Sequence, residues 1–212
     1  MTWPPSVRHP LALMGKRVML RPLVAGDFEA WREVRIRARD WLVKWEPMPI
    51  PGQPDATQDR RVFAFRCGAR ERERQLGTGY GFGIFVGPDR ARFAGEINLS
   101  SVQRGPYQNA YVGYWMDEAL AGNSYTPEAL VVICRFAFED LGLHRVQASI
   151  IPRNAPSHRV AEKVGLRNEG TALRYLEING RWEDHVRYAM TSEDWAERRD
   201  ELMERWIVPG GA

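Results

Sequence analysis

The segment from Leu120 to Ala129, LAGNSYTPEA, has the composition of a loop that leads directly into a helix. Gly122 permits tight backbone curvature, and either Ser124 or Thr126 is suited to cap the helix that follows. Pro127 fits the first helical turn, where its missing N–H is not needed. Successive free N–H groups at a helix N-terminus bind anions, most often phosphate. The segment therefore predicts either an ordinary capped helix start or a phosphate-binding loop.

The residues that ligate metals or act as nucleophiles are scattered along the chain. No histidine is spaced with acidic or cysteine partners as a metal site requires; the four are His9, His144, His158 and His185. Cys67 and Cys134 lie far apart among apolar residues, as buried structural thiols usually do. We therefore expect no metal site, and the two cysteines fit a reducing cytoplasm.

The elements that must position the loop follow each other in a mixed order. Apolar residues at helical spacing predict helices over residues 27–45, 57–75, 125–141, 154–164 and 192–206. Strands are expected over residues 15–23, 79–86, 91–102, 109–116 and 144–151, with a late hairpin that turns on Asn179-Gly180. This order is that of a mixed α/β fold, and it matches neither a doubly wound sheet nor a barrel.

Length and charge limit the class of protein. The 212 residues are enough for one well-buried domain, so we expect a single domain over residues 1–212, with residues 1–15 as an irregular N-terminal extension. Lys and Arg exceed Asp and Glu by only 30 to 27, which is weak support for a polyanionic partner. No signal-length apolar stretch or membrane-spanning run is present. We expect a cytoplasmic protein that binds neither membrane nor nucleic acid directly.

Four further segments carry a family resemblance. These are GYWMD before the loop, FAFEDLGLHRV after the helix, IPRNAPSHRVAEKVGL, and the late RYLEINGRWEDHVRYAM. Together they resemble the acetyl-CoA core of the GNAT N-acetyltransferases, and more narrowly the RimJ/RimL group, which acetylates protein N-terminal amines. The similarity runs from about Phe93 to Trp195. It implies a mostly antiparallel sheet flanked by helices and splayed open between the strands YVGYWM and HRVQASII.

The same resemblance implies acetyl-CoA as cosubstrate and assigns its binding residues. The pyrophosphate loop corresponds to Ala121, Gly122, Asn123, Ser124, Tyr125 and Thr126. Ala121 stands where the family has Arg or Gln, and Ser124 stands where it has its main glycine. An N–H cradle needs only the backbone, and Ser124 could add a hydroxyl donor. If Ser124 cannot adopt a glycine-like conformation, cofactor affinity falls.

The remaining cofactor contacts also follow from the resemblance. Backbone groups of Tyr114, Trp115 and Met116 would pair with the pantetheine arm, and Asn154 would contact that arm. Asn154 is equally suited to cap a helix. Ser157 matches a hydroxyl near the thiol, where it either protonates the departing thiolate or is an ordinary first-turn serine.

The general base is harder to assign. Ala110 occupies the strand position where some relatives carry a catalytic glutamate. We expect Glu96 to accept the proton through water, or else to point outward from its strand. Tyr175 and Glu177 share one face of the late hairpin by period-two spacing and could line the acceptor cleft. His185 is a second-rank candidate.

Three functions fit these residues. The first is acetyl transfer by direct attack of a protein or peptide N-terminal amine, with a ribosomal protein as one candidate acceptor. The second keeps the chemistry but uses a small amine in a pocket closed by Trp3, Trp41, Trp45 and the proline-rich loop. The third is a non-catalytic acyl-CoA-binding or interaction module.

Overall fold

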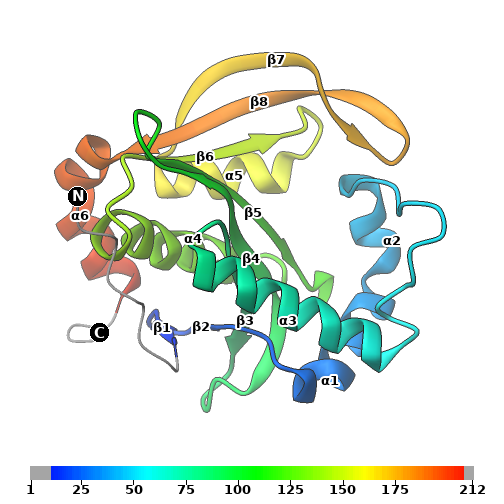
Figure 1. Cartoon of the computed structure of the whole chain (residues 1–212). Coiled ribbons are helices and arrows are strands. Elements are labelled where there is room, and N and C mark those ends of the chain that lie inside the picture. Colours follow the sequence, from blue (N-terminus) through cyan, green and yellow to red (C-terminus); the bar gives the residue numbers. More distant parts are fainter. Residues whose placement is uncertain (1–10, 208–212) are drawn as a thin grey trace.

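The computed structural model describes residues 11–207, and eight strands in this part form one sheet in the order β1-β2-β3-β4-β5-β6-β8-β7 (Figure 1). The strands are β1 (Leu13–Met14), β2 (Met19–Arg21), β3 (Tyr80–Val86), β4 (Arg92–Gln103), β5 (Asn109–Met116), β6 (Arg145–Ile150), β7 (Arg167–Ile178) and β8 (Arg181–Thr191). Neighbouring strands are antiparallel except for β5 and β6. The expected mixed, mostly antiparallel sheet is confirmed, and its continuity supports the single domain that we propose.

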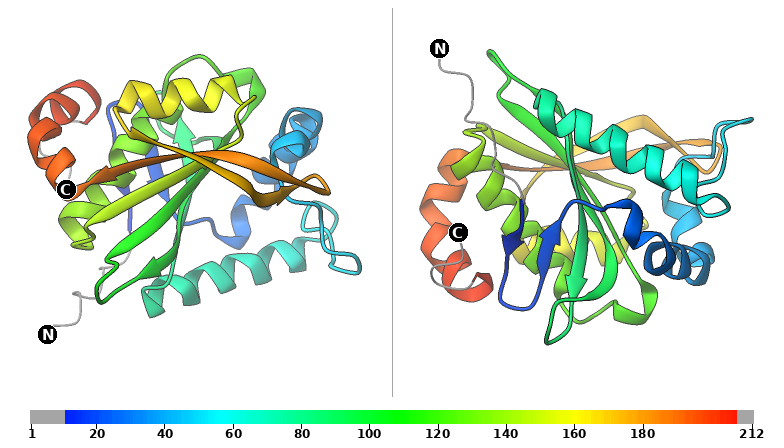
Figure 2. Two further views of the ribbon diagram at one scale, coloured as in Figure 1. Left: turned by 90° about the horizontal axis from the view of Figure 1, so that it is seen from above. Right: turned by 60° about the horizontal axis from the view of Figure 1, so that its bottom comes forward.

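Helices cover both faces of this sheet (Figure 2). They are α1 (Phe28–Arg37), α2 (Arg39–Leu42), α3 (Arg60–Leu76), α4 (Tyr125–Arg135), α5 (Ala155–Val164) and α6 (Ser192–Trp206), with short 3-10 turns η1 (Ala25–Asp27), η2 (Val43–Trp45) and η3 (Glu118–Leu120) and the π-helix η4 (Phe136–Asp140). The apolar residues of α4 belong to the larger core, whereas α1 and α3 bury a second, aromatic cluster around Trp31 and Phe63. Among residues 11–207, every helix falls short of the length and apolarity that a membrane span requires.

The sheet splays where β5 and β6, a parallel pair, meet. β5 and β6 pair only over Asn109–Tyr111 and Arg145–Gln147. Beyond this point β5 continues along β4 as far as Met116, while β6 continues along β8 as far as Ile150. Among residues 11–207, the edge of β5 that faces β6 therefore has no strand partner over residues 112–116, as expected from the sequence.

Several boundaries differ from those expected. The helix predicted over 27–45 breaks at Ala38, which leaves helical geometry at ψ 10°. The helix predicted from Thr57 begins at Arg60, because Asp55 first accepts a hydrogen bond from the Thr57 N–H and Asp59 then caps the helix. The helix predicted to Leu141 widens into η4, where the Leu141 N–H donates to the Phe136 carbonyl.

The N-terminal extension is less irregular than predicted. Leu13 and Met14 form the edge strand β1 because the chain reverses at Gly15 and pairs with β2. Residues 1–10 lie outside the described part of the chain.

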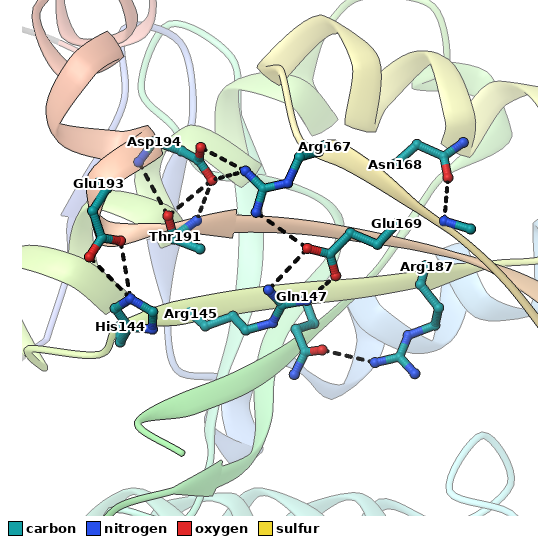
Figure 3. A network of polar contacts seen from close by, with 11 residues as sticks. His144, Arg145, Gln147, Arg167, Asn168, Glu169, Arg187, Thr191, Glu193 and Asp194 are labelled. Atoms are coloured by element: carbon teal, nitrogen blue, oxygen red, sulfur yellow. Dashed lines mark hydrogen bonds and ion pairs between the residues drawn. The ribbon is translucent and has the colours of Figure 1, made fainter. Parts of the chain in front are cut away.

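Ion pairs attach the C-terminal helix α6 to the sheet (Figure 3). Thr191 and Asp194 form a capping box at its start. Arg167 on β7 reaches both Asp194, at 2.8 Å, and Glu169. Glu169 in turn pairs with Arg145 on β6. The network joins three strands to α6 on the side of the molecule where β5 and β6 are still paired.

Candidate active site

A cavity of about 980 Å³ opens at the splay between β5 and β6. Every residue that the sequence assigned to the cofactor lines it except Asn123, whose amide folds back to the Leu120 carbonyl at 3.1 Å. Glu96 and Ser157 line it as well. The splay thus brings segments that are distant in sequence to one cleft.

The loop before α4 offers backbone N–H groups to this cleft. Gly122 and Ser124 both take positive φ values, 84° and 62°. Ser124 therefore does adopt the glycine-like conformation that the loop needs. Within the described residues, no N–H from position 122 to position 126 has a backbone acceptor, and the first that does is Glu128. Such a run of free N–H groups at the start of a helix is suited to a phosphate.

The prediction that Ser124 caps α4 is wrong. Ser124 occupies the N-cap position, but its side chain makes no capping hydrogen bond. Its positive φ directs Oγ elsewhere, and Oγ accepts a hydrogen bond from Lys163 Nζ at 2.6 Å. Thr126, the other candidate, lies inside the first turn of α4.

Arg17 binds the backbone carbonyls of the loop before α4. Its guanidinium donates to the carbonyls of Asn123 and Ser124, at 3.1 and 3.4 Å, and to the carboxylate of Glu128. Glu128 is fully buried and also accepts the backbone N–H of Val18 at 3.0 Å. With its carbonyls held by Arg17, the loop keeps its N–H groups available for the cavity.

Asn154 and Ser157 begin helix α5. Asn154 is the N-cap, and its Oδ1 accepts the Ser157 N–H at 3.3 Å. The capping role of Asn154 is therefore confirmed, and its contact with pantetheine stays a prediction. Ser157 Oγ lies 2.9 Å from the hydroxyl of Tyr114 on β5.

Glu96 projects from β4 toward helices α1 and α3. Its carboxylate accepts hydrogen bonds from Trp31 Nε1 at 2.8 Å and from Arg66 at 2.5 Å. Its side chain is only 14 % exposed. A carboxylate has four lone-pair sites, so Glu96 retains acceptor capacity toward the cleft.

Aromatic and proline residues form the end of the cavity near Glu96. The lining there includes Trp31, Trp41, Leu42, Trp45, Pro47, Pro49 and Trp115. The hairpin turn lies beside Glu46, because the Asn179 N–H donates to the Glu46 carbonyl at 2.9 Å. Glu46 is itself held by Arg35 through two hydrogen bonds of 2.6 and 2.8 Å. Trp3, which the sequence also assigned to this end, lies outside the described residues.

The late hairpin does not bring Tyr175 and Glu177 into the cavity lining. Glu177 accepts the Gly180 N–H of its own turn, and Tyr175 packs between Arg187 and His185. His185 is 2 % exposed and its Nδ1 meets the Glu183 carbonyl at 2.9 Å, so it is a buried structural histidine.

Ala110 also lies outside the cavity lining. It is fully buried where β5 still pairs with β6, opposite Val146. A carboxylate at position 110 would enter the core rather than the cleft. Glu46 and Glu96 both line the cavity and both bind an arginine, but Glu96 lies opposite Trp115 at the splayed end of β5, which makes it the better candidate base.

Neither Cys67 nor Cys134 lines the cavity. Burial raises the pKa of Cys134 to about 12 and that of Cys67 to about 11. Cys134 is buried as expected, while Cys67 is half-buried. Among residues 11–207, no group of histidine, cysteine or acidic side chains has the arrangement of a metal site.

Sequence reasoning missed the partners of the site residues. The sequence predicts a packing role for Trp31 and a solvent-exposed face for the helix that carries Arg66, yet both side chains bind Glu96. Lys163 lies 39 positions from Ser124 in sequence, so only the packing of α5 beside α4 reveals the pair. The tyrosine of the GYWM segment was assigned through its backbone alone, whereas its hydroxyl reaches Ser157.

Comparison with known proteins identifies the family of this fold and site. The model of the acetyltransferase (GNAT) domain family matches residues 17–167. Because this match covers well over half of the chain, the chain belongs to the GNAT acetyltransferase family and is an enzyme of that class. The family resemblance expected from the sequence is confirmed.

Individual relatives narrow the class to N-acetyltransferases of the RimJ type. The chain is 33 % identical to the probable N-acetyltransferase YjcK of Bacillus subtilis, over 86 % of this chain and 98 % of that protein. It is 32 % identical to the [ribosomal protein uS5]-alanine N-acetyltransferase of Escherichia coli, over 82 % of this chain and 88 % of the relative. The structure of Mycobacterium smegmatis RimJ in complex with CoA-disulfide superposes with a TM-score of 0.81 at 30 % identity, covering 94 % of this chain and 97 % of that one.

Proposed function

We propose that this protein transfers an acetyl group from acetyl-CoA to the N-terminal α-amine of a protein or peptide by direct attack. One observation carries the proposal: a single cleft joins the N–H groups before α4, the hydroxyl of Ser157 and the carboxylate of Glu96. Bound acetyl-CoA supplies the thioester that the amine attacks. The residues present fit such a ligand, because the free N–H groups and Lys163 are suited to its phosphates.

Glu96 and Ser157 have separate tasks in the cleft. As the amine nitrogen bonds to the carbonyl carbon, Glu96 removes its proton through water. As the carbon–sulfur bond breaks with its electron pair on sulfur, Ser157 Oγ–H protonates the thiolate and regains a proton from solvent. General acids and bases of this kind each contribute about 10²–10⁴-fold to a rate. Confinement of amine and thioester in one cleft adds the benefit of proximity.

The acceptor is inferred from relatives and from chemistry. The Escherichia coli relative is named for acetylating the alanine of a ribosomal protein, and we propose an acceptor of the same class here, met in the cytoplasm. The test mixes protein, acetyl-CoA and peptides with free or blocked N-termini, follows thiol release, and locates the acetyl group by mass spectrometry. Acetylation of the free N-terminus supports the proposal, and its absence with every peptide contradicts it.

A small amine is the second candidate acceptor. Trp41, Trp45 and Pro47 line part of the cleft, and the Asn179 N–H donates to the carbonyl of Glu46 in the same lining. Polyamines and amino sugars belong in the same assay. A kcat/KM higher for one of these amines than for every peptide would favour this candidate.

A further inference from the structure

Two hydroxyl groups meet at the middle of the cleft. Tyr114 Oη lies 2.9 Å from Ser157 Oγ and 3.4 Å from the Ser157 carbonyl. Both residues line the cavity, and the ring of Tyr114 packs against the main core. The contact joins β5, at the splay, to the first turn of α5.

The chemistry of the pair favours Tyr114 as the donor. A phenol, with a pKa of about 10, is far more acidic than an aliphatic alcohol and is the better hydrogen-bond donor. When the phenol donates to Ser157 Oγ, the serine proton is free to point into the cavity. The N–H of Ser157 is held by Asn154 Oδ1, so the position of the serine is fixed from both sides.

Tyr114 keeps its proton at neutral pH. Burial raises the pKa of its phenol to about 12, with a smaller contribution from Tyr188 and a partial offset by the hydrogen bond with Ser157. The phenol is therefore a lasting hydrogen-bond donor rather than the source of the transferred proton.

We propose that Tyr114 is a positioning residue for acetyl transfer: its hydroxyl hydrogen-bonds Ser157 Oγ and directs the serine proton toward the departing thiolate. This rests on the proposed function, in which Ser157 is the acid. Tyr114 acts only through Ser157, so its hydroxyl has no value once the serine hydroxyl is removed.

A double-mutant cycle tests this dependence. The variants are Tyr114→Phe, Ser157→Ala and their combination, assayed with acetyl-CoA and a peptide bearing a free N-terminal alanine. Tyr114→Phe removes one oxygen and keeps the ring, and it should lower kcat about ten-fold, the effect of one hydrogen bond. KM for acetyl-CoA should stay unchanged. Ser157→Ala should lower kcat about 10²-fold, and adding Tyr114→Phe should lower it no further.

Tyr188→Phe is the matched control. Among residues 11–207 the Tyr188 hydroxyl hydrogen-bonds His158 Nδ1, at 3.0 Å, rather than Ser157, so this variant should keep the parent kcat. The melting midpoint and the dissociation constant for CoA are measured for every variant. Two results would show a merely structural role and overturn the proposal. One is a markedly lower melting midpoint for Tyr114→Phe. The other is an equal loss of kcat when Tyr114→Phe is introduced into the parent and into Ser157→Ala.

The outcomes separate this proposal from the function on which it rests. If Ser157→Ala keeps the parent kcat, the acid assignment fails. If Ser157→Ala is impaired but Tyr114→Phe keeps the parent kcat, or the two losses multiply, only the positioning role of Tyr114 is refuted. An absence of transfer to any peptide by the parent protein refutes the acceptor instead.

Discussion

Lys163 Nζ on α5 lies 2.6 Å from Ser124 Oγ at the N-cap position of α4, so the two helices meet at the loop that we propose binds phosphate. An ammonium group only donates hydrogen bonds, so Ser124 is the acceptor and keeps its own proton for an anion. The loop itself begins with Ala121 and carries no cationic side chain at that position. Lys163 can supply from α5 the positive charge that the loop lacks.

We therefore predict that Lys163→Met weakens CoA binding about ten-fold, the value of one charge-assisted hydrogen bond. Binding of pantetheine, which has no phosphate, should be unchanged. Lys44→Met is the control, because it removes the same charge from a lysine that lies over Trp41 and Trp45. Calorimetry measures the CoA affinity of the parent and of both variants, and the pantetheine affinity of the parent and Lys163→Met. Equal CoA affinity in Lys163→Met and parent would remove Lys163 from the phosphate site.

The backbone of the loop gives a second prediction. Ser124 holds a left-handed conformation that costs an ordinary residue about 1–2 kcal/mol. Ser124→Gly relieves that cost and should leave or improve CoA affinity, although it removes the partner of Lys163. Gly122→Val places a β-branched residue at φ 84° and should weaken affinity markedly, although nothing lies within 4 Å of the added Cβ. Normal CoA binding by Gly122→Val would mean that the cradle lies elsewhere.

The base assignment predicts unequal effects of two carboxylate variants. Glu96→Gln should lower kcat about 10²-fold, since an amide cannot accept the proton. Glu177→Gln, in the hairpin turn, should change kcat less than two-fold, because Glu177 binds only its own turn. The comparison uses the same peptide and acetyl-CoA for both variants. A larger loss in Glu177→Gln would transfer the base role to the hairpin.

The network that attaches α6 predicts acid sensitivity. Although burial opposes the shift at Asp194, hydrogen bonds from Thr191 and Arg167 lower its pKa, and the hydrogen bond from Arg145 lowers that of Glu169. Lowered folded-state pKa values contribute stability above the unfolded values of about 4, and this contribution is lost as pH falls through the folded values.

Melting curves of parent and Arg167→Gln test this expectation. Below about pH 4 the parent should lose stability. Arg167→Gln should lose less over the same range, because the pKa values of its Asp194 and Glu169 are lowered less. At pH 7 the variant should melt a few degrees lower, as expected for the loss of exposed ion pairs. Parallel pH profiles for the two proteins would show that the network is not the cause.

Much of the fold was predictable because its signals are local. The aromatic and β-branched residues of 109–116, the Asn-Gly hairpin turn and the Asn154 cap each identify their element without reference to the rest of the chain. The break at Ala38 and the π-helix after Arg135 were not predictable, because a continuous apolar periodicity runs through both positions.

The site was predictable where a single segment forms it. The loop from position 121 to 126 and the Asn154–Ser157 turn reach the cleft as expected. The partners of Glu96 were not foreseeable, because Trp31 and Arg66 are brought to it by the packing of two helices onto one strand. Tyr175 and Glu177 share a face of the hairpin, but period-two spacing alone does not reveal that this face lies outside the cavity lining.

The central claim is that the acceptor is an N-terminal amine. An α-amine has a pKa of about 7.7–8.0 and a lysine side chain about 10.4. At pH 7.5 the neutral amine therefore costs about 0.5 kcal/mol at an N-terminus but about 4 kcal/mol at lysine, at 1.36 kcal/mol per pKa unit. The Glu96 carboxylate already accepts hydrogen bonds from Trp31 and Arg66, so it is better matched to deprotonating an N-terminal amine than a lysine.

The most direct measurement compares kcat/KM at pH 7.5 for two peptides of matched sequence. One has a free N-terminus and no lysine, and the other has a blocked N-terminus and one lysine. We predict that the free N-terminus is preferred by about 10²-fold or more, with the lysine peptide near the rate without enzyme. Equal or faster acetylation of lysine would contradict the assignment.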